Sequence, residues 1–260
     1  MSNYKAVCIF DLDGTLLNEK SQVDRDVASA IHALRDGGVL PVIATGRSIG
    51  EVTHAMEATG IDSIVGLNGQ VVHAEGKKIF SKSFRPEFME RFRAFAHSLG
   101  HDICFYNGDG FWAEKKNKLM ETCYDAINSP HPEEIPGKYK TELVELLMII
   151  SEDPELDQKY QDAFPELGIY RTTKYSIDTI SAETSKATGI QHLIRELGLE
   201  HLPTYAFGDG LNDVPMFSAV DYGIAMGNAH EKLKSIADYV TASHVEGGLV
   251  QAFERYGLLY

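Results

Sequence analysis

The sequence predicts an α/β protein with a doubly wound core around a parallel sheet and an α+β segment inserted into it. Short apolar runs alternate with helical patterns over the first 67 residues, and the same alternation resumes after residue 184. Between these two parts the rhythm changes to hairpins mixed with helices. A repeated β-α-β order predicts parallel strands joined by right-handed crossovers, whereas mixed hairpins and helices are typical of an α+β unit.

The first part contains three strand patterns and two helical patterns. Continuous apolar runs at 6–10, 39–44 and 64–67 indicate strands buried on both faces, the last one ending at the turn Asn68-Gly69. Apolar residues recur at helical spacing from Val23 to Leu34, before Gly37-Gly38, and a second helix is expected over 48–59, before Gly60.

The inserted segment is expected to begin with a helix over 86–99. Strands at 103–106 and 111–113 flank Asn107-Gly108-Asp109-Gly110, a strong hairpin signal. A strand over 143–150, a helix over 154–164 and strands over 168–173 and 175–181 follow. The joints fall near 80–83 and 181–185, so the core is expected to comprise 1–82 and 184–260, and the insert 83–183.

The last part returns to alternating elements. We expect a helix over 186–197, a strand over 204–207, a short helix over 213–219, a strand over 222–225 and a final helix over 249–256. These elements complete the sheet that the first part begins.

Composition excludes several classes of protein. The 260 residues carry 24 Lys and Arg against 38 Asp and Glu, a formal charge of -14, which argues against nucleic acid or an anionic membrane as partner. The charge still permits a phosphorylated small molecule, because a divalent cation can reverse the sign locally. Cys8, Cys104 and Cys123 have no metal-site spacing and are expected to be apolar fillers. With no signal peptide and no apolar run near the ~18 residues of a membrane span, we expect a cytoplasmic protein.

Two aspartates stand directly after the first buried strand, in the run Asp11-Leu12-Asp13-Gly14-Thr15. Open α/β sheets bind ligands at the carboxyl ends of their strands. Two carboxylates about 4 Å apart repel by about 4 kcal/mol at an effective dielectric constant near 20. A divalent cation or a proton would remove that repulsion, so the run indicates a cation site. The alternative is a helix N-cap followed by an exposed acid.

Spacing excludes two familiar motifs. A calcium loop starting at Asp11 would need Gly at its sixth position and Glu at its twelfth, where the chain has Leu16 and Gln22. The run Gly208-Asp209-Gly210-Leu211-Asn212-Asp213 begins like a dinucleotide fingerprint, but its sixth residue is Asp, and Asp209 would place negative charge beside a pyrophosphate.

The run from Gly208 to Asp213 fits a magnesium site better. Asp209 emerges at the carboxyl end of a strand, and Asn212 and Asp213 add further oxygen atoms. Magnesium prefers a few carboxylates, with water and phosphate completing its shell. A simple Asx/Gly turn is the alternative.

Two more segments offer groups that anionic oxygens bind. The run Ala44-Thr45-Gly46-Arg47 opens a helix after a strand, so the Thr45 hydroxyl and nearby N–H groups could hold a phosphate. Lys186 begins another helix and offers a compact positive charge of the kind that binds phosphate. The alternatives are a solvated Lys186 and an Arg47 engaged in a structural ion pair.

These four segments, in this order, resemble the haloacid dehalogenase superfamily of phosphohydrolases. The matching runs are Asp11-Leu12-Asp13-Gly14-Thr15-Leu16, Thr45-Gly46-Arg47, Lys186, and Gly208-Asp209-Gly210-Leu211-Asn212-Asp213. The insert, together with the Asn68-Gly69 turn, is similar to the Cof-type subgroup with a type IIB cap. The resemblance spans nearly the whole chain and implies a Mg²⁺-dependent phosphatase of small phosphorylated metabolites, such as sugar phosphates.

The resemblance also implies a role for each matched residue. Asp11 would be the nucleophile that forms an aspartyl phosphate, and Asp13 the general acid and then the general base. Magnesium would be held by Asp11, the Asp13 backbone carbonyl and Asp209. Asp213 would either bind the ion directly or bind one of the groups that do. The implied phosphate-binding groups are Thr45, the Gly46 N–H, Lys186, Asn212 and backbone N–H groups near Leu12.

Two other functions stay open at this point. A phosphomutase of the same superfamily would share these residues. A non-catalytic phospho-switch similar to a response-regulator receiver is a distant alternative, because an insert of about 100 residues suits the enclosure of a substrate. Related ion pumps resemble this motif but have Thr where Asp13 stands, and the chain has no membrane-span pattern. Substrate choice is expected to lie in the insert, with Tyr106, Trp112, Arg171 and Lys174 as unranked candidates, the first two more typical of packing.

Overall fold

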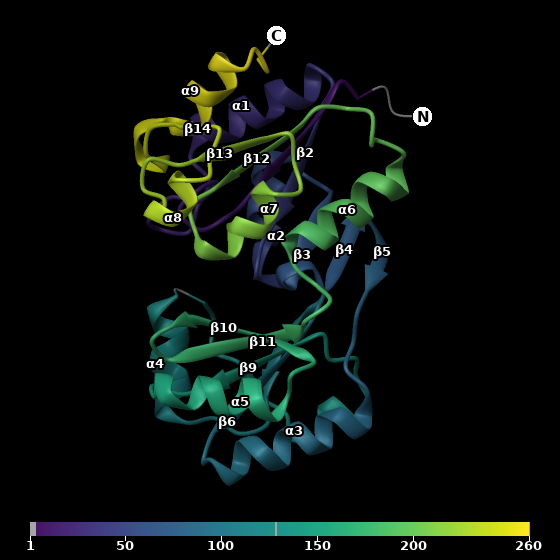
Figure 1. Cartoon of the computed structure of the whole chain (residues 1–260), viewed down its shortest axis with the longest axis vertical. Coiled ribbons are helices and arrows are strands. Elements are labelled where there is room, and N and C mark those ends of the chain that lie inside the picture. Colours follow the sequence, from purple (N-terminus) through teal and green to yellow (C-terminus); the bar gives the residue numbers. More distant parts are fainter. Residues whose placement is uncertain (1–3, 128, 260) are drawn as a thin grey trace. The chain divides into compact units, whose positions relative to one another are not determined.

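The computed structural model describes residues 4–127 and 129–259, which form two compact units (Figure 1). Of the described residues, one unit comprises 4–47, 52–80 and 185–259, and the other comprises 48–51, 81–127 and 129–184. The short segment Ser48–Glu51, which lies within the range expected for the core, thus belongs to the second unit. There its Ile49 N–H donates to the carbonyl of Gly108 at 3.0 Å.

The first unit is built on a sheet in the order β14-β13-β12-β1-β2-β3-β4-β5, with six parallel strands followed by an antiparallel β4. The strands are β1 (Ala6–Phe10), β2 (Val39–Ala44), β3 (Ile64–Gly66), β4 (Val71–Ala74), β5 (Lys77–Ser81), β12 (Thr204–Gly208), β13 (Tyr222–Ala225) and β14 (Tyr239–Val240). The parallel core expected from the sequence is confirmed. The β4–β5 pair was not anticipated.

Helices cover both faces of this sheet, as a doubly wound fold requires. Val7 and Ile9 of β1 pack on the side of α6, while Phe10 makes an edge-to-face contact on the opposite side with Phe253 of α9, since successive residues of a strand face opposite ways. The helices are α1 (Arg25–Asp36), α2 (Ile49–Thr59), α6 (Lys186–Leu197), α7 (Val214–Phe217), α8 (Glu231–Lys234) and α9 (Gly248–Arg255), with α8 absent from the sequence-based expectation.

The second unit contains a sheet in the order β10-β11-β9-β6-β7-β8, antiparallel except for the β7–β8 pair. Its strands are β6 (Asp102–Asn107), β7 (Gly110–Ala113), β8 (Glu133–Glu134), β9 (Leu146–Ile150), β10 (Leu167–Thr173) and β11 (Ser176–Ser181), and its helices are α3 (Pro86–Ser98), α4 (Lys118–Ala126) and α5 (Asp157–Ala163). The hairpin of β6 and β7 is confirmed, whereas α4 was not expected.

Aromatic packing fills one side of the second unit's sheet. Phe92 of α3 and Tyr160 of α5 pack with strand residues such as Phe105 and Ile149 in one buried cluster. Strand β9 begins three residues later than expected: Leu143 is exposed, and Glu145 is buried and accepts a hydrogen bond from the Gly108 N–H at 2.6 Å.

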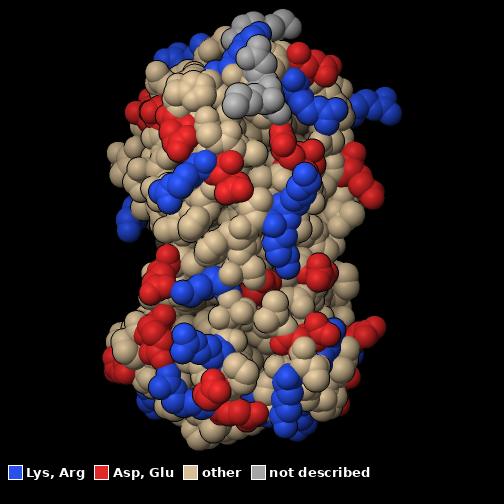
Figure 2. All heavy atoms as spheres, turned by 90° about the vertical axis from the view of Figure 1, so that its right-hand side faces the viewer, with Lys and Arg blue, Asp and Glu red and all other residues tan. Residues whose placement is uncertain are grey.

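Charged side chains, helices and cysteines are placed as expected for the composition of the chain. On the face shown in Figure 2, basic and acidic side chains are interspersed rather than gathered by sign. None of the helices in the described part of the chain combines the length and apolar character that a bilayer-spanning segment needs. All three cysteines are free and buried, as their expected role of apolar fillers requires.

Candidate active site

Three adjacent strands bring the predicted polar residues to one edge of the first unit's sheet. Strands β12, β1 and β2 are neighbours and run parallel, so their carboxyl ends meet. Asp209, Asp11 and Thr45 each follow directly after one of these strands. The Asp11 N–H donates to the carbonyl of Phe207 at 2.9 Å, which extends the β1–β12 pairing up to the carboxylate.

Three aspartates form a carboxylate cluster at this edge. Asp11, Asp209 and Asp213 each offer one carboxylate oxygen, and these oxygens lie within 4.8 Å of one another. Asp213 is 0% exposed and Asp11 is 7% exposed. The carboxylate oxygens of Asp11 and Asp209 are thus close enough to bind the same ion.

Lys186 is the cation of this cluster. Its Nζ lies 2.5 Å from Asp11 Oδ1 and 2.7 Å from Asp213 Oδ1, and its side chain is 1% exposed. Helix α6 begins with a capping box in which Ser185 and Thr188 bond reciprocally, which fixes the first turn that carries the lysine. A solvated Lys186, the alternative left open by the sequence, is therefore wrong.

Backbone N–H groups hold the loop after β12 in place. Asp213 Oδ2 accepts hydrogen bonds from the N–H groups of Asp209 and Gly210 at 3.0 and 2.9 Å. With Oδ1 bound to Lys186, both oxygens of Asp213 are engaged. Gly14, at φ 77°, lies so close to this loop that a Cβ there would stand 2.5 Å from Asp209 Oδ2.

The cluster carries more negative charge than its lysine compensates. Burial, and next the charge of Asp213, raise the pKa of Asp11 well above its usual range, although Lys186 opposes the change. Burial and Asp213 also raise the pKa of Asp209 to about 6. Burial alone would lower the pKa of Lys186, but Asp11 and Asp213 outweigh it and raise that pKa. Three carboxylates around one ammonium favour a further cation.

Asp13 lies outside the carboxylate cluster. Arg47 binds it in a bidentate manner, with Nε 2.8 Å from Oδ2 and Nη2 2.7 Å from Oδ1. The Asp13 side chain is 53% exposed, compared with 16% for Arg47. The ion-pair alternative for Arg47 is therefore observed, and the Asp13 carboxylate itself is not among the clustered oxygens.

The predicted phosphate-binding groups differ in their placement. Thr45 is buried and its Oγ1 accepts from the Arg47 N–H at 3.1 Å, which leaves its own proton available to a ligand. Leu12 is buried, and its carbonyl accepts from the N–H groups of the next turn. Asn212, by contrast, is an exposed residue beside the buried Asp213.

Two residues that contribute to the site were not identified from the sequence. Thr15 donates from Oγ1 to Asp209 Oδ1 at 3.1 Å, and its place at the end of the first aspartate run was an available signal. Asn228 donates from Nδ2 to the carbonyl of Gly14 at 2.8 Å. Asn228 follows β13 without any local pattern, so the sequence offered no signal for it.

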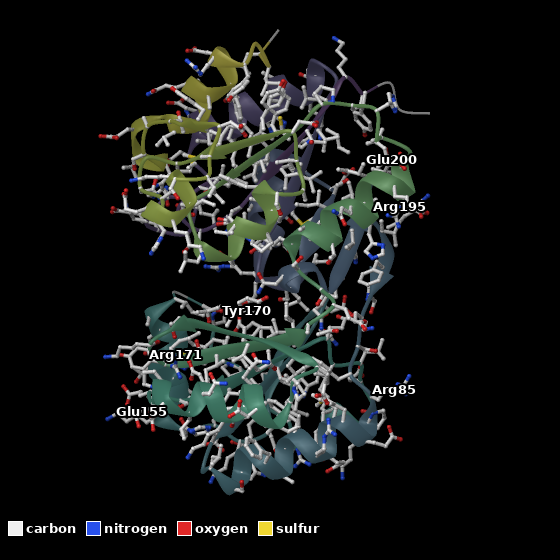
Figure 3. All side chains as sticks on the ribbon, viewed as in Figure 1. Arg85, Glu155, Tyr170, Arg171, Arg195 and Glu200 are labelled. Carbon is white, nitrogen blue, oxygen red and sulfur yellow. The ribbon has the colours of Figure 1, made fainter. Side chains whose placement is uncertain are left out.

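The substrate candidates in the second unit are mostly structural. Trp112 and Tyr106 are buried, which confirms their packing role. Arg171 is paired with Asp157, with Nη2 at 2.6 Å from Oδ1, whereas the preceding residue of β10, Tyr170, is 39% exposed (Figure 3). The Lys174 ammonium lies over the ring of Tyr175.

The fold and this carboxylate site define a class of hydrolase. Residues 8–253 match the model of the haloacid dehalogenase-like hydrolase family, and the chain belongs to that family. Several of its relatives and structural neighbours are named phosphatases, and the chain is a phosphoric monoester hydrolase. The resemblance stated from the motifs is thereby confirmed.

Three proteins illustrate how far the similarity of sequence and structure extends along the chain. "Putative phosphatase YkrA" of Bacillus subtilis (strain 168) is 32% identical over 252 residues, covering 96% of this chain and 97% of the relative. Phosphatase BT1666 from Bacteroides thetaiotaomicron superposes with a TM-score of 0.89 at 27% identity, covering 99% and 97% of the two chains. The HAD subclass IIB sugar phosphatase BT4131 superposes with a TM-score of 0.85 at 26% identity, covering 97% and 99%.

Proposed function

We propose that this hydrolase is a Mg²⁺-dependent phosphatase of small phosphorylated metabolites, sugar phosphates or related compounds, and that it acts through an aspartyl phosphate on Asp11. One observation carries the proposal: the buried Asp11 carboxylate is held by Lys186 and lies among the oxygens of Asp209 and Asp213. A nucleophile fixed by a buried cation, next to surplus negative charge, suits the attack on a phosphoryl group that arrives with a metal ion.

The donor set fits magnesium. All the clustered ligand atoms are carboxylate oxygens, which is the ligand type that Mg²⁺ prefers, and the surplus negative charge favours a cation. Asp11, Asp209 and the backbone carbonyl of Asp13 would hold the ion. Both oxygens of Asp213 are already bound by Lys186 and backbone N–H groups, so this residue would position the lysine and the loop after β12 without binding the ion itself. When bound, the ion would neutralise charge on the phosphoryl oxygens.

The chain's own residues divide the reaction into two steps. An Asp11 carboxylate oxygen attacks phosphorus, and the bond from phosphorus to the leaving oxygen breaks with its electron pair while Asp13 supplies a proton to that oxygen. Asp13 then takes a proton from water as the water oxygen attacks phosphorus and releases Asp11. Asp13 can do so only when its bidentate contact with Arg47 opens.

Groups at the same edge would bind the phosphoryl oxygens. The Thr45 hydroxyl donates to no described residue, and the Gly46 N–H and backbone N–H groups near Leu12 lie in the loops after β2 and β1. Lys186 adds positive charge. Asn212 is exposed and would contribute from the loop after β12. Fixed donors of this kind stabilise the charge of the transition state without reorganising.

The second unit, residues 83–183 in the predicted division of the chain, is proposed to be a type IIB cap that sets substrate choice. The similarity to a subclass IIB sugar phosphatase supports both this assignment and a sugar phosphate or related metabolite as substrate. A screen of phosphorylated metabolites, with and without Mg²⁺, would identify the substrate.

The test is the hydrolysis of p-nitrophenyl phosphate in Mg²⁺ by the wild type and by Asp11→Asn. We expect Asp11→Asn to lose at least about 1,000-fold in kcat, because the nucleophile is removed. Its circular dichroism spectrum should stay unchanged, and Asp26→Asn, at an exposed position in the first turn of α1, should keep full activity. An active Asp11→Asn would refute the mechanism.

A phosphomutase shares these residues and needs a separate experiment. With one hexose phosphate and a bisphosphate activator, a hydrolase releases inorganic phosphate, whereas a mutase yields the isomeric hexose phosphate. We expect free phosphate.

A further inference from the structure

The loop that follows β13 is fixed to the loop that carries Asp209. The Met226 N–H donates to the carbonyl of Gly208 at 3.0 Å. The His230 N–H donates to the carbonyl of Asp209 at 2.9 Å, and Asn228 lies between these two anchored residues. Strands β13, β12 and β1 are consecutive, parallel neighbours in the sheet, so the loops at their carboxyl ends meet at the edge that bears the carboxylate cluster.

The Asn228 side chain joins the segments that follow β13, β1 and β14. Its Nδ2 donates to the carbonyl of Gly14, in the loop after β1, at 2.8 Å. Its Oδ1 accepts from the His244 N–H at 3.0 Å and from the Ser243 hydroxyl at 3.3 Å, in the segment after β14. Because β12 lies between β13 and β1, the contact to Gly14 reaches past the strand that leads into Asp209. Although Asn228 is an exposed residue, both polar atoms of its amide are bound to protein.

Gly14 is a residue whose backbone needs such a contact. It has a φ of 77°, and a glycine leaves the peptide planes on either side of it free to rotate. The plane before it carries the Asp13 carbonyl, and the plane after it carries the carbonyl that Asn228 binds. Gly14 also lies against Asp209, since a Cβ would stand 2.5 Å from Asp209 Oδ2, and the next residue, Thr15, donates to Asp209 Oδ1 at 3.1 Å. A shift of this glycine would therefore disturb both the Asp13 carbonyl and the Asp209 carboxylate.

We propose that Asn228 is a positioning residue for the cation site: by holding the Gly14 carbonyl, it keeps the Asp13 carbonyl and the Asp209 carboxylate in place to bind the ion. The inference rests on the proposed function, in which these two groups are ligands of Mg²⁺. Groups that contact the ligands of a metal fix the orientation of those ligands, and their loss commonly weakens metal binding about 10- to 100-fold. Because both polar atoms of Asn228 are already bound, its effect on the ion is exerted through Gly14.

The test is the dissociation constant of Mg²⁺, measured by isothermal titration calorimetry without substrate. Asn228→Ala removes the contact to Gly14, and we expect it to raise the dissociation constant about 10-fold or more. Asn228→Asp keeps an acceptor oxygen for His244 but sets a second oxygen against the Gly14 carbonyl, so it should also raise the constant. Added negative charge alone would lower the constant, so the sign of this effect separates positioning from electrostatics.

Ser243→Ala is the matched control. It removes the hydroxyl that donates to Asn228 Oδ1 and leaves the bond to Gly14 in place, so its dissociation constant should equal that of the wild type. The midpoint of urea unfolding in EDTA reports any loss of stability separately. An unchanged constant in Asn228→Ala, a lower one in Asn228→Asp, or an equal rise in Ser243→Ala would overturn the inference. A wild type that binds no Mg²⁺ would instead overturn the proposed function, so the two failures are distinguishable.

Discussion

Replacing Lys186 with methionine should destabilise the first unit strongly, because it leaves two buried carboxylates without their cation. The Nζ contacts of 2.5 and 2.7 Å each correspond to about 6–7 kcal/mol of gross attraction at an effective dielectric constant near 20. Desolvation offsets most of that attraction. The net cost of removing one partner from a buried ion pair is about 3–5 kcal/mol. Because whole domains are stable by only about 5–15 kcal/mol, we expect a large fall in the urea midpoint.

The assay is urea unfolding followed by circular dichroism at pH 7.5 in EDTA, so that no added cation replaces the lysine. Lys234→Met is the control, since Lys234 pairs at 3.0 Å with a Glu231 side chain that is 87% exposed, and exposed pairs contribute about 0–1 kcal/mol. A loss below about 1 kcal/mol in Lys186→Met would refute the reasoning.

A double variant tests whether unpaired charge is the cause. In the wild type, Asp213→Asn removes one partner of Lys186 and should lower stability. In the Lys186→Met background the same substitution removes a buried charge and should restore part of the loss. An effect of the same sign in both backgrounds would contradict the electrostatic explanation.

Three further predictions concern glycine contacts and buried acids. Gly69→Ala, with its Cβ 2.0 Å from the Ser185 carbonyl, should cost about 1–3 kcal/mol in urea unfolding and lower kcat, whereas Gly100→Ala, at φ 77° with no described atom within 4 Å, should cost only about 1 kcal/mol. Burial and the neighbouring Glu51 raise the pKa of Asp178 from 3.8 to about 7. The folded protein therefore binds this proton more tightly than the unfolded chain, and stability should fall as pH rises between those two values. Asp178→Asn should reduce this fall in stability with pH and stabilise the protein at pH 8 by about 1–3 kcal/mol in urea unfolding. The pKa of Asp209 is raised to about 6, so in EDTA this residue should also make stability fall as pH rises between 4 and 6. In urea unfolding from pH 4 to 8, the stability of Asp209→Asn should therefore depend less on pH below pH 6 than that of the wild type.

The parallel core was predictable because its strands carry a strong local signal. Strands β1 and β2 are buried along their whole length, so their residues form continuous apolar runs with sharp ends. Strand β5 is exposed or half-buried over Lys77–Ser81 and has no such run. Helix α4 begins at an N-cap, Asn117, whose side chain accepts from the Met120 N–H, but its apolar stripe is short and gives only a weak helical signal.

The site was predictable to the extent that strand ends determine it. Asp11 and Asp209 follow adjacent parallel strands, and that order alone brings them together. The partner of Arg47 was not predictable, because a solvent-facing acid and a ligand-binding acid look alike in sequence. Nor could the buried Asn68 Oδ1, which has no hydrogen-bond partner in the described part of the chain, be foreseen, since it depends on the left-handed backbone of residues 67–69 and on the close approach of Gly46.

The two acids of the first motif are two residues apart, yet their surroundings differ in a way that supports different roles. Asp11 is buried, and one of its oxygens is fixed by a lysine that is itself shielded from water, which would hold the proposed nucleophile in place. Asp13 is half-exposed, and its contact with Arg47 can open with the Asp13 carboxylate still facing solvent. A group that must give up and recover a proton within each turnover needs that freedom, whereas a nucleophile needs a fixed position. In other enzymes, too, two acids in different environments take different catalytic roles, because each environment sets the pKa of its own carboxyl.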